Sequence, residues 1–216
     1  MRRITLALLT TLVALPPTSA GAQIIRGGRF GLRDPQYWVS ATLGWQNGWT
    51  VYDGLTGSRW DLGDSQAYGG SVERAVAGGV TVGVRANTAA PAVRYTTANS
   101  PDVRVADTRV TQALGVVHVS SGRDLRSVFE LGVGTTIYSG FHERVTNARL
   151  GPEKTDADFA FVFVYGLGYS FSRNFHVDVV QDLGTSLHQK TGLTQGEDTS
   201  ASIRSTRLVA RYGFGG

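Results

Sequence analysis

Three polar residues in the middle of the chain could in principle activate a nucleophile. His118 and Ser120 stand two positions apart, and Glu130 follows ten positions after the serine. A histidine beside a serine can remove the hydroxyl proton, and a carboxylate can orient the imidazole ring. However, His118 lies in a segment whose two faces differ little, and Ser120 borders a short turn. A single short motif often arises by chance, so we expect no enzymatic activity from these residues.

A larger set of charged residues recurs on one face of the alternating segments of the chain. Its members are Glu73, Arg85, Glu130, His176, Asp178, Asp182, Arg207 and Arg211, with His118 on the same face of its own segment. Buried charges are tolerated when they are paired, so we expect ion pairs between these acids and arginines. In particular, we expect His176, Asp178 and Asp182 to meet Arg207 and Arg211. We expect neither a metal site nor a cofactor, because His176 and Asp178 have no further ligands at a suitable spacing.

The element that must position these charges is clearest between residues 158 and 183. Bulky residues occupy every second position of the first half: Phe159, Phe161, Phe163, Tyr165, Leu167 and Tyr169. Smaller residues alternate with them, and the pattern resumes after a break at residues 171–174. Successive side chains of a strand point to opposite faces, so one face of this predicted hairpin is a wall of aromatic and aliphatic groups.

Six further alternating segments, together with the two of this hairpin, define the fold class. Alternating segments are predicted at residues 37–46, 66–74, 80–86, 108–120, 126–139, 158–170, 175–183 and 202–214. Long loops are expected at 47–65, 87–107, 140–157 and 187–201, and short turns alternate with them. That asymmetry is typical of outer-membrane barrels. The sequence therefore predicts an all-β fold, a closed eight-stranded antiparallel up-and-down transmembrane β-barrel with both termini in the periplasm.

The N-terminus carries an export signal. Arg2 and Arg3 precede an apolar stretch and a small-residue cleavage site at Ala20-Gly21-Ala22, which is the pattern of a secretory signal peptide. We therefore expect a signal peptide at 1–22, a flexible periplasmic lead-in at 23–36 and the barrel at 37–216. Cysteine is absent, which excludes disulfides and thiolate sites. Loss of the two arginines lowers the formal net charge from +4 to +2, so nothing indicates a nucleic-acid partner.

Aromatic residues near the predicted strand ends suggest interfacial girdles. They are Trp45, Trp49, Trp60, Tyr138, Phe141 and Tyr169. Tryptophan and tyrosine are enriched where a membrane meets water. We expect these side chains on the outer surface of the barrel.

The signal peptide, eight alternating segments, loop asymmetry and final strand RLVARYGF resemble small bacterial outer-membrane barrels of the OmpA/OmpX type. The resemblance covers the whole mature chain. It implies an outer-membrane location, contact with outer-membrane lipid and lipopolysaccharide, recognition of the last strand by the barrel-assembly machinery, and a monomer. It also implies a structural, adhesive or surface-protective role.

Three other functions remain open from the sequence. His118, Ser120 and Glu130 are similar to the His-x-Ser and Glu arrangement of lipid A deacylase barrels, although Ser121-Gly122 replaces the Asn-Gly that follows it in that family. The charged interior is compatible with a structural plug or with a narrow ion path gated by a switchable pair. The small interior of an eight-stranded barrel favours the plug. The third alternative is a soluble lipocalin-like carrier of an apolar ligand, which would need its bulky face inside.

Overall fold

The computed structural model describes residues 34–53, 58–97, 100–149, 156–187 and 200–216, which form eleven β-strands. The strands are β1 (Tyr37–Gln46), β2 (Trp49–Asp53), β3 (Ser58–Leu62), β4 (Ser65–Ala77), β5 (Val80–Ala89), β6 (Ala92–Thr97), β7 (Ser100–Gly122), β8 (Leu125–Glu143), β9 (Asp156–Ser170), β10 (Phe175–Leu187) and β11 (Ser200–Phe214). None of the described residues belongs to a helix that could cross a membrane. The predicted signal peptide and most of the lead-in lie outside the described ranges.

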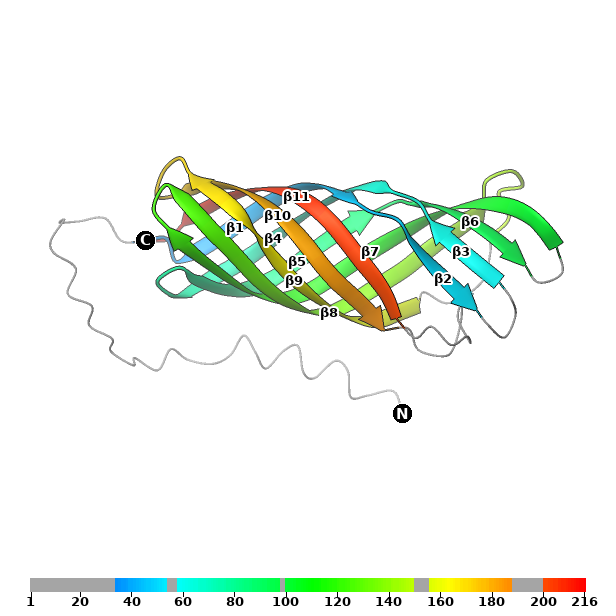
Figure 1. The fold of residues 1–216 in the computed structure, drawn as a ribbon. Helices are drawn as coiled ribbons and strands as arrows, with labels where there is room; N and C mark the ends of the chain where they lie inside the picture. The colour runs from blue at the N-terminus through cyan, green and yellow to red at the C-terminus, as the bar shows by residue number, and fades with distance from the viewer. Residues whose placement is uncertain (1–33, 54–57, 98–99, 150–155, 188–199) are drawn as a thin grey trace, which may run out of the picture. The chain divides into compact units, whose positions relative to one another are not determined.

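Eight of the strands close into a ring (Figure 1). The order is β1-β4-β5-β7-β8-β9-β10-β11, and the pairing of β1 with β11 returns to the start. Every pair is antiparallel, and the ring leaves no unpaired edge within the barrel. The predicted fold class is therefore confirmed.

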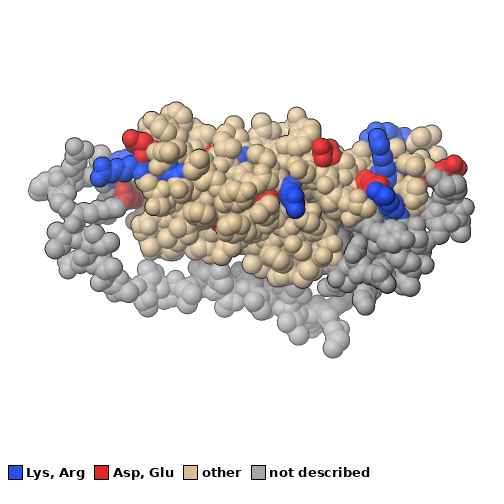
Figure 2. Space-filling view, in the orientation of Figure 1, with Lys and Arg blue, Asp and Glu red and all other residues tan. Residues whose placement is uncertain are grey.

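The side chains alternate between the two faces of this ring as the sequence predicted. On β9, Phe161 is 46% exposed and the next residue, Val162, is 3% exposed. The outward residues of β8, β9 and β10 are largely aromatic or aliphatic, whereas Glu130, Asp178 and Asp182 of the same strands are buried. Figure 2 shows the consequence, a middle part of the barrel wall that is almost free of charged side chains. The bulky face points outward, so the lipocalin-like arrangement is not the one that forms.

The prediction of a long loop is wrong for two segments, because both contain strands. Residues 47–65 include the β2–β3 hairpin, and residues 87–107 include the end of β5, all of β6 and the start of β7. β3 pairs with β6, and β6 pairs with the first part of β7, so this sheet continues the barrel wall beyond the ring. We call this part, together with the beginning of β7 and the end of β8, the extension. Similarly, β8 reaches Glu143 and shortens the expected loop at 140–157.

A β-bulge on β8 changes the phase of the alternation where the ring meets the extension. Ser139 pairs with Arg109 and His142 with Asp107, so Gly140 and Phe141 together oppose Thr108. Gly140 has φ +68°, a conformation that suits glycine. Before the bulge even-numbered residues of β8 face inward, and after it Phe141 does.

The expected girdle is wrong for several aromatic residues. Trp49, Tyr138 and Phe141 are at most 8% exposed and form the core of the extension. Its other members are Leu62, Val93, Tyr95, Ala106, Val110 and Ala201, with Trp60 packed against them. Trp60 stacks on Tyr95 with ring centroids 4.8 Å apart. Trp45 and Tyr169 do lie on the outer surface, at 49% and 47% exposure.

The opposite end of the barrel carries the short turns and the end of β11 (Figure 1). Gln36, expected in the lead-in, donates its backbone N–H to Phe214 and accepts one from Ala75. A Cβ added to Gly213 would lie 2.7 Å from Pro35 and 2.9 Å from Trp38, so both side chains pack directly on this glycine. We call this end the turn end.

Candidate functional site

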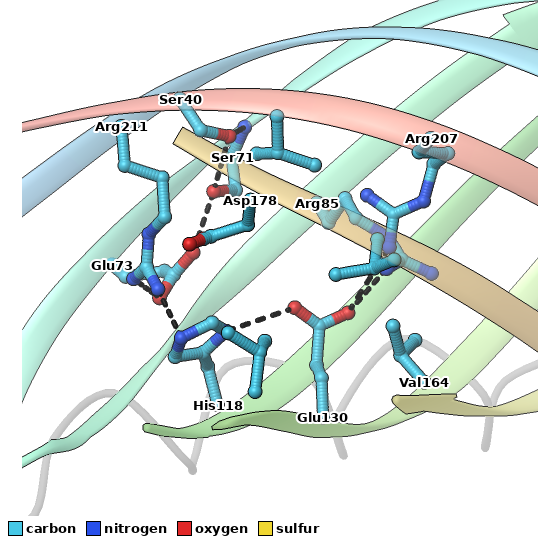
Figure 3. Close-up of a pocket in the computed structure, with 13 residues that line it drawn as sticks. Ser40, Ser71, Glu73, Arg85, His118, Glu130, Val164, Asp178, Arg207 and Arg211 are labelled. Carbon is cyan, nitrogen blue, oxygen red and sulfur yellow. Dashed lines mark hydrogen bonds and ion pairs between the residues drawn. The ribbon is translucent and has the colours of Figure 1, made fainter. Parts of the chain in front are cut away.

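The interior of the ring brings together the charged residues that the alternation selected. All eight of them have side chains buried to at most 9% exposure. They come from β4, β5, β8, β10 and β11, and closure of the ring brings together those that are not on neighbouring strands. Figure 3 shows most of them around a small pocket, which Val164 and three other valines also line.

Two arginines and two carboxylates form the central cluster. Arg207 donates from Nε to Asp182 Oδ2 at 2.8 Å and from Nη2 to Oδ1 at 2.8 Å. Arg85 donates from Nη1 to Glu130 and lies 3.7 Å from Asp182, while Arg207 Nη2 lies 3.9 Å from Glu130 Oε1. Each guanidinium is thus placed between both carboxylates, as buried charges require.

A second cluster lies around Glu73. Arg211 Nη2 donates to Glu73 Oε2 at 2.5 Å, Ser71 donates to Glu73 Oε1 at 2.6 Å, and Thr81 also donates to the carboxylate. His118 joins the two clusters, because its Nε2 contacts Arg211 Nη1 and its Nδ1 lies 3.6 Å from Glu130 Oε2. Arginine is always a donor, so Nε2 accepts and the ring hydrogen sits on Nδ1.

Asp178 makes a pair that differs from the prediction. Its partner is Arg126 on β8, at 2.6 Å, and not Arg207 or Arg211. The register explains this, because Gly168 of β9 pairs with both Arg126 and Asp178 and places the three residues in one row. Gly168 has no side chain, so Arg126 reaches across it. A Cβ there would lie 1.9 Å from Asp178 Oδ1 and 3.2 Å from Arg126 Nη2.

His176 lies at the turn end of the barrel, beside Trp38 and Arg211. It is the cross-strand neighbour of Arg211, as expected, but its imidazole packs on Trp38 with centroids 4.6 Å apart. The guanidinium of Arg211 lies 5.4 Å from the centre of the same indole. Together with Pro35, these rings cover the interior from the turn end.

The geometry at His118 opposes nucleophilic catalysis. Activation of Ser120 would need an imidazole nitrogen able to accept the hydroxyl proton. Nε2 of His118 is already occupied by Arg211, and Nδ1 faces Glu130. The Ser120 hydroxyl instead accepts from Arg126 at 3.3 Å. In the part of the chain that the structure describes, no three His, Asp or Glu side chains are arranged for a metal ion either.

The sequence prediction missed Arg126, Ser71 and Thr81 as partners in this interior. Arg126 could have been found, since it is in phase with Val128 and Glu130 on β8, and its side chain is buried. Ser71 and Thr81 are likewise in phase with Glu73 and Arg85, but nothing in the sequence marks a hydroxyl group as the partner of a carboxylate.

Comparisons with known proteins agree with this architecture. No protein-family model and no curated protein matches the sequence. Among solved structures, Neisserial surface protein A is similar with a TM-score of 0.55 and 11% identity, over 82% of this chain and 97% of that chain. OprG from Pseudomonas aeruginosa is similar with a TM-score of 0.53 and 9% identity, over 83% and 94% of the two chains. The chain has the fold of the small outer-membrane β-barrels. At these identities the likeness concerns the fold alone.

Proposed function

We propose that this protein is an integral outer-membrane β-barrel with a closed interior and a structural or surface-interaction role. One observation carries the proposal. The ring turns aromatic and aliphatic side chains outward and charged side chains inward, which is the reverse of a soluble barrel. A wall of this kind is stable when hydrocarbon surrounds it, and closure of the ring satisfies the backbone groups that lipid cannot.

Cell fractionation followed by gel electrophoresis tests the location. The protein should be recovered from outer membranes with detergent, and its migration should change when the sample is heated, as is typical of a closed barrel that resists unfolding. Recovery from the soluble periplasmic fraction without detergent would contradict the proposal. So would identical migration before and after heating of protein extracted in mild detergent.

The interior supports a plug in preference to an ion path. Ion pairs fill the middle of the ring, the aromatic core fills the extension, and Trp38 with His176 covers the turn end. Planar-bilayer recordings on the purified protein should therefore show no steady conductance. A steady single-channel current from wild-type protein, absent in protein-free controls, would favour the ion path.

The proposed partners follow from this location. We expect lipid and lipopolysaccharide around the apolar wall, and a monomer, because the ring has no open edge. The last strand presents Tyr212 and Phe214 outward at the turn end, where the assembly machinery would read them.

A further inference from the structure

A small cavity lies in the ring interior, where the groups of ion pairs meet. Its charged lining consists of three acids and three arginines: Glu73, Arg85, Glu130, Asp178, Arg207 and Arg211. The central cluster, the cluster around Glu73 and the Arg126–Asp178 pair each contribute to this lining. Figure 3 shows these side chains around the cavity, with Ser40, Ser71 and His118 beside them. A molecule bound there would contact all three groups at once.

The arginines of this lining have N–H groups to spare. A guanidinium carries five N–H donors and no acceptor. Arg85 donates from Nη1 to Glu130, and its Nε and Nη2 have no hydrogen-bond partner among the residues that the structure describes. Arg211 donates from both terminal nitrogens, and its Nε is without a partner in the same part of the chain. Asp178 offers an acceptor, because Arg126 donates to Oδ1 and the carboxylate has a second oxygen.

The size of the cavity restricts the ligand to a very small molecule. Its volume is about 20 Å³, and a buried site needs roughly 10–15 Å³ to hold one water molecule. A phosphate group or an organic ligand is too large for this space. The four valines of the lining, Val128, Val164, Val180 and Val209, fix its apolar boundary.

The charge of the lining favours a neutral ligand over an ion. The three carboxylates balance the three guanidinium groups, and a buried ion without a counter-charge is unfavourable. Water is neutral, and buried water molecules typically make about three hydrogen bonds to polar groups around them. Water also accepts and donates, which suits a lining in which the arginines donate and Asp178 accepts.

We propose that this cavity is a binding site for a single water molecule, which accepts hydrogen bonds from Arg85 and Arg211 and donates one to Asp178. The water joins the two clusters and the Arg126–Asp178 pair into one network, and hydrogen bonds in such a network strengthen one another. The site goes beyond the proposed location of the protein. It depends on the ring interior alone, so it forms in detergent micelles as well as in a membrane.

Nuclear magnetic resonance of the protein refolded in detergent micelles tests the site. The arginine side chains would be labelled with an isotope of nitrogen, and nuclear Overhauser contacts would be recorded between water and the Nε–H protons. We expect cross-peaks from water to the Nε–H of Arg85 and of Arg211, with the sign of a long-lived bound molecule. Hydroxyl protons of the neighbouring Ser71 and Thr81 exchange with water, so variants must separate the two sources of a cross-peak.

Val180→Ile and Val164→Ile each place an extra methyl group in the cavity, one from β10 and one from β9, and keep every polar residue of the lining. Both variants should lose at least half of the cross-peak intensity. Val116→Ile is the matched control, because Val116 belongs to the same buried apolar cluster and does not line the cavity. It should keep the full intensity. A heat-modifiable gel band shows that each variant is folded.

Three results would overturn the site. They are the absence of water cross-peaks at both arginines in folded wild-type protein, full intensity in both filling variants, and an equal loss in Val116→Ile. Loss of the wild-type cross-peaks on addition of chloride would also overturn it, because the cavity would then take an anion. Recovery of the protein from outer membranes is measured separately, so the water site and the proposed location can fail independently.

Discussion

The interior of the ring and the interior of the extension are filled in opposite ways, although β7 and β8 run through both. In the ring, Glu130 faces inward between two arginines, while its neighbours Phe129 and Leu131 are 49% and 60% exposed. In the extension, Phe141 of the same strand is buried among aromatic rings, and Arg144 lies outside. The strand thus changes from an inverted barrel wall to the wall of an ordinary soluble β-protein.

The difference indicates what surrounds each part of the wall, hydrocarbon or water. Outward apolar groups cost little in hydrocarbon, so the ring gains no hydrophobic stabilisation by turning them inward. In the extension, water outside makes burial of Trp49, Tyr95 and Phe141 favourable by roughly 25 cal/mol for each Å² of apolar surface removed from it. The bulge at Gly140 sits at this border and lets one strand serve both purposes.

Removal of one interior charge should have the largest effect. Glu130→Gln leaves Arg85 and Arg207 short of a carboxylate in the buried cluster, and breaking such a pair costs about 3–5 kcal/mol of the free energy of unfolding. Urea unfolding in detergent micelles would measure this.

Glu143→Gln provides the control, since Glu143 is on the same strand but in the extension, 3.7 Å from an exposed arginine. It should cost under about 1 kcal/mol, as is usual for partly exposed pairs. Equal losses in the two variants would mean that the ring and the extension do not differ in the way their charges are held.

Gly168→Ala should disrupt the Arg126–Asp178 ion pair without removing either charge. The added methyl group would occupy the space through which Arg126 reaches Asp178, so we expect a loss of about 3 kcal/mol in the free energy of unfolding. Gly115→Ala on β7 is the matched control, because an added Cβ there has nothing nearer than 3.7 Å. Gly115→Ala should raise the free energy of unfolding by about 0.5 kcal/mol, because alanine lowers the conformational entropy of the unfolded chain. A stabilising effect at both glycines would show that the Arg126–Asp178 pair does not depend on the gap at Gly168.

The same contrast explains what the sequence could predict. Period-two alternation identified the ring strands, because the outward face of each is largely apolar, and the eight charged residues on the other face are buried. It did not identify β2, β3 and β6, which are five or six residues long and have glycine, aspartate or proline in the segments beside them. Partner choice was also beyond reach, because Asp178 meets Arg126 through a register across three strands. The inward position of Phe141 depends on a bulge that alternation alone does not reveal.

Gly140→Ala tests the bulge directly. A Cβ at this position meets no atom within 4 Å, so the cost is the backbone conformation alone, about 1–2 kcal/mol for a residue held at positive φ. The change should loosen the extension and leave the ring intact. The rate of amide hydrogen exchange should therefore rise in β6 and at the end of β8, while the amides of β9 and β10 stay protected. Faster exchange throughout the ring would contradict the separation of the two regions.

The smallest expected effect concerns a hydroxyl group in the aromatic core. Tyr95 is 5% exposed, and its Oη has no hydrogen-bond partner among the residues that the structure describes. A buried hydroxyl without a partner is unfavourable, so Tyr95→Phe should stabilise the extension by about 1 kcal/mol while keeping the stacking on Trp60. The melting temperature of the extension, followed by near-ultraviolet circular dichroism of the tryptophans, would report the change. A lower melting temperature would mean that the hydroxyl is hydrogen-bonded in solution.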